Sequence, residues 1–69
     1  MNEDVLRGRW AELKGRLRLQ WGKLSDDDIA LIRGDREILL GKLQALYGRT
    51  RDDLERELKA WLDYNRSRP

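Results

Sequence analysis

The sequence predicts an all-α protein, a small four-helix domain of two crossed helical hairpins related by a pseudo-two-fold internal repeat. Three observations point to this class. Apolar residues recur at steps of three and four along most of the 69 residues, the spacing of one helix face. Hydroxyl–acid pairs and glycines fall where helices should begin and end. The two halves of the chain also align with each other at a shift of 26 residues.

The first predicted helix spans residues 4–21. Its apolar residues step by four, three, four and four positions, which makes one continuous helical stripe. We expect this stripe to lie in the core; it consists of Leu6, Trp10, Leu13, Leu17 and Trp21.

Three further helices are expected over residues 26–33, 36–47 and 51–65. The first of them has only a short apolar run, Ile29 to Ile32, which is enough for about two helical turns. The other two have longer stripes, whose expected core positions include Leu43, Tyr47, Leu58 and Trp61.

Helix starts are indicated by two short motifs. Ser25 with Asp28, and Thr50 with Asp53, have the spacing at which a capping hydroxyl and an acidic side chain satisfy free backbone N–H groups. Helix ends are expected at three glycines, because glycine readily adopts the left-handed backbone that terminates a helix. These are Gly22, Gly34 and Gly48.

The internal repeat divides the chain into two helical hairpins, over about 4–33 and 36–65, within a single domain of residues 1–69. The shift places Trp21 on Tyr47 and Gly22 on Gly48, so that each half has an aromatic–Gly–basic corner followed by a capped helix. Two hairpins packed across one another would bury their facing stripes in one core.

Gly15 and Gly41 also align in the repeat, but they point away from the main stripe of their helices. Each costs about 1 kcal/mol relative to alanine inside a helix. The favoured interpretation is that another part of the fold approaches closely at these positions. The alternative is that the helices are weak by design and become fully ordered with a partner.

Composition excludes several classes of site. The chain has no cysteine and no histidine, which removes disulfides, thiolate metal sites and the commonest general base. The run Asp26 to Asp28 lacks the spacing and turn glycine of a calcium loop, and Ser25 and Thr50 have no base beside them in sequence. We therefore expect no catalytic residue, no metal, no cofactor and no small-molecule substrate.

The N-terminal residues are acidic, and the longest apolar run is far too short to span a membrane. A cytoplasmic location is therefore the expectation. The partner is unknown, with protein or nucleic acid as the candidates.

Nucleic-acid binding is the main functional alternative. The formal net charge is only +2, but the first predicted helix is locally basic. Its candidate phosphate contacts are Arg9, Lys14, Arg16, Arg18 and Lys23. Basic residues also stand beside aromatic ones, as in Trp21-Gly22-Lys23, although the tryptophans fit the core better than a base-stacking surface.

One long motif is distinctive. Residues 21–28 read W-G-K-L-S-D-D-D, preceded by Leu13-Lys14-Gly15 and followed by residues 40–44, L-G-K-L-Q, and by Tyr47-Gly48. This frame resembles the CsbD-like family of small bacterial stress-response proteins, and its length and register look closest to the YjbJ-like branch.

The resemblance implies a four-helix fold similar to sterile-alpha-motif bundles and no catalytic residues. It also implies a bacterial, cytoplasmic protein whose abundance rises under general stress or on entry to stationary phase. Arginine and leucine are more frequent here than expected of the family, for example at Arg16, Arg18 and Leu40. The resulting hypothesis is a non-enzymatic general stress-response protein, either an abundant soluble protectant or a small interaction module. Weak, sequence-nonspecific nucleic-acid binding through the basic first helix is the alternative.

Overall fold

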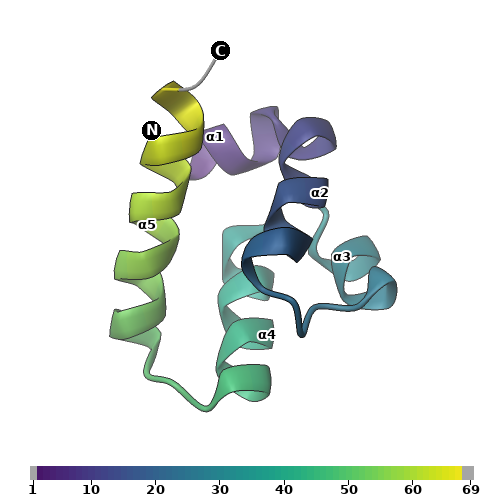
Figure 1. The fold of residues 1–69 in the computed structure, drawn as a ribbon, viewed down its shortest axis with the longest axis vertical. Coiled ribbons are helices and arrows are strands. Elements are labelled where there is room, and N and C mark those ends of the chain that lie inside the picture. The colour runs from purple at the N-terminus through teal and green to yellow at the C-terminus, as the bar shows by residue number, and fades with distance from the viewer. Residues whose placement is uncertain (1, 68–69) are drawn as a thin grey trace.

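The computed structural model describes residues 2–67, with side chains from Val5 to Arg66. Within that range the chain forms five helices and no strand, which confirms the all-α class. The helices are α1 (Asn2–Gly8), α2 (Trp10–Gln20), α3 (Asp26–Ile32), α4 (Arg36–Tyr47) and α5 (Arg51–Ser67), arranged as in Figure 1. Among them, none is both long and apolar enough to cross a membrane.

The single helix expected over 4–21 is wrong, because the chain breaks into α1 and α2 at Arg9. The Arg9 backbone has φ −117° and ψ 24°, outside the helical region, and it follows Gly8, a weak helix former. The bend meets the turn between α3 and α4, where a Cβ added to Gly34 would lie only 3.0 Å from the Arg7 Cα atom. The α3–α4 turn therefore approaches the backbone of α1 closely beside the break.

The remaining helices begin where the sequence places them or within one residue. The predicted range 36–47 matches α4, while α3 ends one residue before its predicted end and α5 continues two residues past its own. One cap was missed: the Asp35 carboxylate accepts from the backbone N–H groups of Glu37 and Ile38, at 2.9 and 3.3 Å, and begins α4.

Two of the three glycine stops have the expected backbone. Gly34 and Gly48 have φ values of 84° and 66°, in the left-handed region. The prediction for Gly22 is wrong in detail: α2 already ends at Gln20, and Trp21 closes it with φ −122° and a hydrogen bond from its N–H to the Leu17 carbonyl. A non-glycine residue, Arg33, adopts the left-handed conformation at the end of α3, with φ 45°.

Around Gly15 and Gly41 the expectation of a close approach is wrong. A Cβ added at either position would meet nothing within 4 Å among the described atoms. Both glycines face open space on their helices, so packing does not require them.

The core lies where the five helices converge. Twelve apolar side chains are buried, ten of them leucine or isoleucine at no more than 1% exposure. They are Leu6, Leu13, Leu17, Trp21, Leu24, Ile32, Leu39, Leu40, Leu43, Leu54, Leu58 and Leu62. Burying a leucine stabilises a fold by about 1.5–3 kcal/mol relative to leaving it exposed, so this cluster supplies most of the driving force.

Three of the expected core residues lie at its margin. Trp10, Tyr47 and Trp61 are only partly buried, although each packs against the buried cluster. Large aromatic side chains are rarely buried completely, and in a small domain the margin is never far away.

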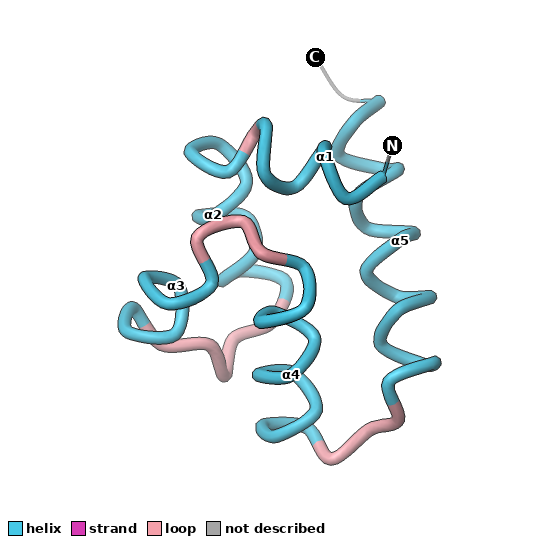
Figure 2. Tube along the Cα trace, turned by 180° about the vertical axis from the view of Figure 1, so that it is seen from behind, coloured by secondary structure: helices cyan, strands magenta, loops and turns pink. Residues whose placement is uncertain are grey.

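Helix packing is most extensive between α4 and α5, followed by α1 with α5 and α3 with α4. Helix α1 also packs on α4, and the view from behind shows α1 near the C-terminal end of α5 (Figure 2). The two halves are therefore interleaved, since the N-terminal helix packs on both helices of the second hairpin. The likeness to sterile-alpha-motif bundles stays a prediction.

Candidate functional site

The sequence-predicted cap residues hold the starts of α3 and α5. Ser25 Oγ accepts from the Asp28 N–H at 3.1 Å, and the Asp28 carboxylate accepts from the Ser25 N–H at 3.0 Å. Thr50 Oγ1 accepts from the Asp53 N–H at 3.2 Å. Both hydroxyl groups are therefore engaged with backbone at helix starts.

Asp28 has a second role, because Lys42 of α4 lies 3.2 Å from its carboxylate. The hydrogen bond from the Ser25 backbone and that from Lys42 hold the pKa of Asp28 below its usual value. The cap thereby ties α3 to α4.

The two aromatic–Gly–basic corners lie against each other. The Lys23 N–H donates to the Tyr47 hydroxyl at 3.1 Å, while Lys23 Nζ donates to the Leu46 carbonyl at 3.4 Å and lies 5.1 Å from the centre of the Tyr47 ring. These contacts join the α2–α3 turn to the end of α4. The corners predicted from the repeat are thus joined to each other by Lys23.

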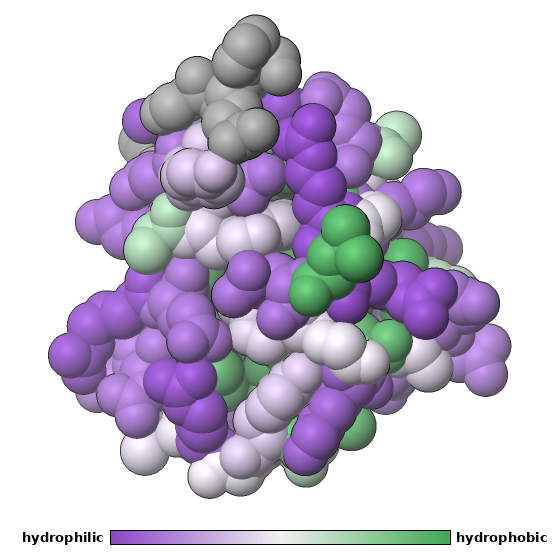
Figure 3. Space-filling model, viewed as in Figure 1, coloured by the Kyte–Doolittle hydropathy of each residue, from purple (hydrophilic) through white to green (hydrophobic). Residues whose placement is uncertain are grey.

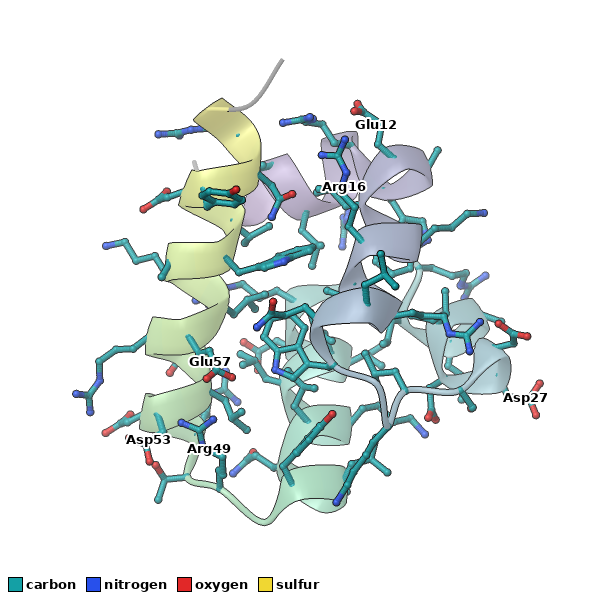
Figure 4. The ribbon with its side chains drawn as sticks, in the orientation of Figure 1. Glu12, Arg16, Asp27, Arg49, Asp53 and Glu57 are labelled. Carbon is teal, nitrogen blue, oxygen red and sulfur yellow. The ribbon has the colours of Figure 1, made fainter. Side chains whose placement is uncertain are left out.

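Glu57 of α5 joins the same region from the other side. Its carboxylate accepts from Trp21 Nε1 at 3.0 Å and from Arg49 at 3.0 Å, and Figure 4 shows Arg49 and Glu57 close together. The pKa of Glu57 is lowered, first by the Arg49 hydrogen bond and then by that from Trp21. No local sequence pattern marked this residue, because its partners, Trp21 and Arg49, lie outside α5.

Four of the five candidate phosphate contacts have partners within the protein, and three of these are Arg9, Arg18 and Lys23. Arg9 pairs with Glu12 at 3.1 Å, and this hydrogen bond raises the pKa of Arg9 and lowers that of Glu12. Arg18 pairs with Asp26, and Lys23 is held in the corner described above. The carboxylates of Glu12 and Asp26 offset the charges of Arg9 and Arg18, and the contacts of Lys23 hold its ammonium group in the corner.

Lys14 and Arg16 differ from the other three, since neither belongs to an ion pair among the described residues. Lys14 is exposed, whereas Arg16 is half-buried and donates to the Asn65 side-chain oxygen at 3.4 Å. Two positions apart on a helix, they point about 200° apart around its axis, so they do not form one surface.

Arg16 lies in a groove between α2 and α5, which we call the α2–α5 groove. The groove has a volume of about 370 Å³ and is lined by Arg16, Leu19, Gln20, Trp61, Tyr64 and Asn65. Figure 4 shows Arg16 on α2, and Figure 3 shows exposed hydrophobic atoms among polar ones on the same face. This groove is the strongest candidate functional site.

Some side chains that line the groove are exposed to solvent, and others are held by contacts within the protein. Leu19 is 87% exposed and Tyr64 is 60% exposed, the two highest exposed fractions among the large apolar side chains that the structure describes. Trp61 packs edge-on against Trp21, with ring centres 5.4 Å apart. Asn65 is 4% exposed. Its side-chain amide donates to the Trp61 backbone carbonyl at 2.8 Å, and its backbone carbonyl accepts from Arg9 at 3.2 Å.

Sequence reasoning found Arg16 and Trp61 but missed the groove they share. Leu19 lies two positions beyond Leu17 and therefore outside the apolar stripe, so its exposure could have been predicted from the sequence. Its proximity to Tyr64 depends on how α2 and α5 pack, which no local pattern specifies.

The described residues hold no cluster of three or more potential metal-ligating side chains. Asp26 to Asp28, the acidic run singled out in the sequence, lie in the first turn of α3, and Figure 4 shows Asp27 at the periphery of the molecule. Acidic side chains in this position interact favourably with the helix dipole.

Comparison with known proteins places the chain among similar sequences. A family model described as CsbD-like matches residues 4–56. The UPF0337 protein YjbJ of Escherichia coli strain K12 is 44% identical over 68 residues, which cover 99% of each chain. UPF0337 proteins of Pectobacterium atrosepticum and Protochlamydia amoebophila are 42% and 46% identical over 66 residues, covering 96% of this chain and 96% and 100% of theirs. No solved structure matches.

Proposed function

Since the chain belongs to the CsbD-like family, we propose that it is a non-enzymatic interaction module of the bacterial general stress response. The family resemblance read from the sequence is confirmed by these matches. The observation that supports a binding role is the α2–α5 groove, where Leu19, 87% exposed, adjoins ordered aromatic rings and a guanidinium group. Aromatic and arginine side chains contribute strongly to binding surfaces.

The non-enzymatic part of the proposal is supported by the structural hydrogen bonds that the candidate polar side chains form. The two hydroxyls with helix-start spacing, Ser25 and Thr50, cap helices, and Glu57 is bonded to Trp21 and Arg49. We further propose a single domain with its halves arranged as crossed hairpins, supported by the packing of α1 on both α4 and α5, and a cytoplasmic location, which the family resemblance implies.

The test compares a binding surface with a bulk protectant in a deletion strain of the host bacterium. The strain is complemented with the wild type, with Leu19→Asp in the groove, or with Leu31→Asp as a matched control. Leu31 is 56% exposed and lies on α3, outside the groove, so both variants should fold.

We expect the protein to accumulate in stationary phase and Leu19→Asp alone to lose stress survival. Survival restored equally by both variants would favour a protectant that acts without a specific surface. Unchanged abundance under stress would contradict a stress role.

A second candidate is weak, sequence-nonspecific nucleic-acid binding through α2. It is favoured by Lys14 and Arg16, which form no ion pair among the described residues; since they lie on opposite sides of α2, each would contact a phosphate separately. The test is an electrophoretic or anisotropy titration at rising salt concentration. Phosphate contacts predict affinity that falls steeply with salt, and affinity independent of salt would exclude them.

A further inference from the structure

We propose that the α2–α5 groove binds single-stranded nucleic acid, with a phosphate on Arg16 and a base stacked on the aromatic side chains of Trp61 and Tyr64. This inference rests on the second candidate function and gives it a ligand class and a site. It also moves the site away from the aromatic–basic corners, whose side chains are bonded to one another.

The anion contact is Arg16. Arg18, Arg49 and Arg51 pair with carboxylates, whereas Arg16 forms no ion pair among the described residues: it donates to the neutral Asn65 amide at 3.4 Å and interacts with the Glu12 carboxylate only electrostatically. A guanidinium group has a planar fork of donors that matches the oxygens of a phosphate. The half-buried position strengthens such a contact, because the group is partly shielded from water.

The stacking surface consists of Trp61 and Tyr64. Trp61 is held by its edge-on contact with the buried Trp21 ring, at an interplanar angle of 63°, and so needs little further ordering. Tyr64 is 60% exposed in the same groove. Bases stack on such rings with little regard to sequence, and the groove volume of about 370 Å³ is at the small end of ligand sites.

Other occupants fit the groove less well. An apolar helix face from a protein partner would desolvate its partly or fully exposed polar side chains, Arg16 and Gln20, without giving them hydrogen bonds. A second copy docked across a two-fold axis here would bring one Arg16 towards the other. A nucleic-acid duplex keeps its bases stacked internally, so only a single strand offers both a phosphate and a free ring face.

The experiment measures fluorescence anisotropy of a labelled oligo-dT and of the same strand paired with oligo-dA, at several salt concentrations. The wild type should bind the single strand at least several-fold more tightly than the duplex. Tyr64→Leu should weaken single-strand binding about tenfold, while Tyr64→Phe, which keeps the ring, should retain it. Arg16→Gln should weaken binding and reduce the slope of log affinity against log salt by about 0.7.

Lys59→Gln is the charge-matched control, because Lys59 is exposed on α5 and lines a different surface hollow with Arg36 and Asp52. It should bind within about twofold of the wild type, as expected for a distant surface charge. Circular dichroism and urea unfolding of each variant establish that the fold is intact.

The outcomes separate this inference from the function on which it rests. Equal binding of both DNA forms, weakened by Lys14→Gln or Arg18→Gln but not by Tyr64→Leu, would overturn the groove site and leave nonspecific binding by α2. Absence of binding at low salt would overturn both. Concentration-dependent dimerisation abolished by Tyr64→Leu would make a second copy the occupant and also overturn it.

Discussion

At the scale of single residues, the two left-handed glycines have different surroundings. A Cβ at Gly34 would lie 3.0 Å from the Arg7 Cα atom, whereas a Cβ at Gly48 would meet no described atom within 4 Å. Gly48→Ala should therefore cost only the backbone strain, about 1–2 kcal/mol. Gly34→Ala adds a clash with α1 and should lower the free energy of unfolding further, as measured by urea denaturation.

Equal losses for the two alanine variants would contradict the contact between the α3–α4 turn and α1. A useful check is the m-value of the transition, which should stay unchanged if both variants retain the native compactness.

A second residue-scale prediction concerns pH and Asp28. Its pKa is lowered in the folded protein by the Ser25 backbone N–H and by Lys42, so its stabilising contribution is present above the unfolded pKa of about 3.9. That contribution is lost as the pH falls through the folded pKa. The unfolding free energy of the wild type should therefore decrease below about pH 5, and Asp28→Asn should flatten this dependence.

Asp27→Asn removes a charge from the same helical turn and serves as the control. If urea denaturation at several pH values gave Asp28→Asn the same pH profile as the wild type, the cap and the Lys42 contact would not act on Asp28 as described.

At the scale of helices, Gly15 in α2 and Gly41 in α4 weaken their elements without a packing need. Both have open space where a Cβ would be. Gly15→Ala and Gly41→Ala should each stabilise the protein by about 0.5–1 kcal/mol, since alanine restricts the unfolded chain and favours helix. Calorimetry should show Tm rising by about 4–8 °C per kcal/mol in a domain of this size.

A fall in Tm for either variant would mean that the glycine has a structural role not visible in its surroundings. A rise in Tm accompanied by weaker oligonucleotide binding would instead favour the alternative from the sequence, in which the glycines destabilise the helices so that they become fully ordered only with a partner.

Helix positions were largely predictable because local signals decide them. The Ser25–Asp28 and Thr50–Asp53 spacings mark the starts of α3 and α5. The break at Arg9 was not predicted, since the apolar stripe continues through it, and the close approach of Gly34 to Arg7 beside it comes from a residue far along the chain.

The candidate site was predictable only in part, for the same reason. Arg9 with Glu12 is a pair at a spacing of three, which local helix geometry brings together. Arg18 with Asp26, and Trp21 with Glu57, depend on how separate helices pack. Such contacts between helices determine which basic side chains can still bind a ligand. Five candidate phosphate contacts were therefore predicted from the sequence, whereas only Arg16 lies in the α2–α5 groove.

At the scale of the whole molecule, Trp21 joins the first half of the chain to α5. Its indole N–H donates to Glu57 and its ring packs edge-on against Trp61. A double-mutant cycle with Trp21→Phe and Glu57→Ala should give a coupling energy of about 0.5–1 kcal/mol. This is less than a buried hydrogen bond to a charged group contributes, because solvent screens the partly exposed carboxylate.

Trp21→Phe combined with Glu55→Ala is the matched control. Glu55 pairs with Arg36 and Arg51 on the other side of α5, so this cycle should be additive within about 0.3–0.5 kcal/mol. Additivity in both cycles would show that the bond between the halves contributes nothing to cooperativity.

The contact between Trp21 and Trp61 also has an optical consequence. Two indole rings with centres 5.4 Å apart and planes inclined at 63° couple their electronic transitions, and such a pair adds a couplet of opposite signs to the far-ultraviolet spectrum of the helices. Helix content calculated from that spectrum would be biased, and replacing either tryptophan would mimic a change in helicity without any unfolding. Conversely, the couplet is an intrinsic signal of whether α2 and α5 remain docked, and it requires no added dye.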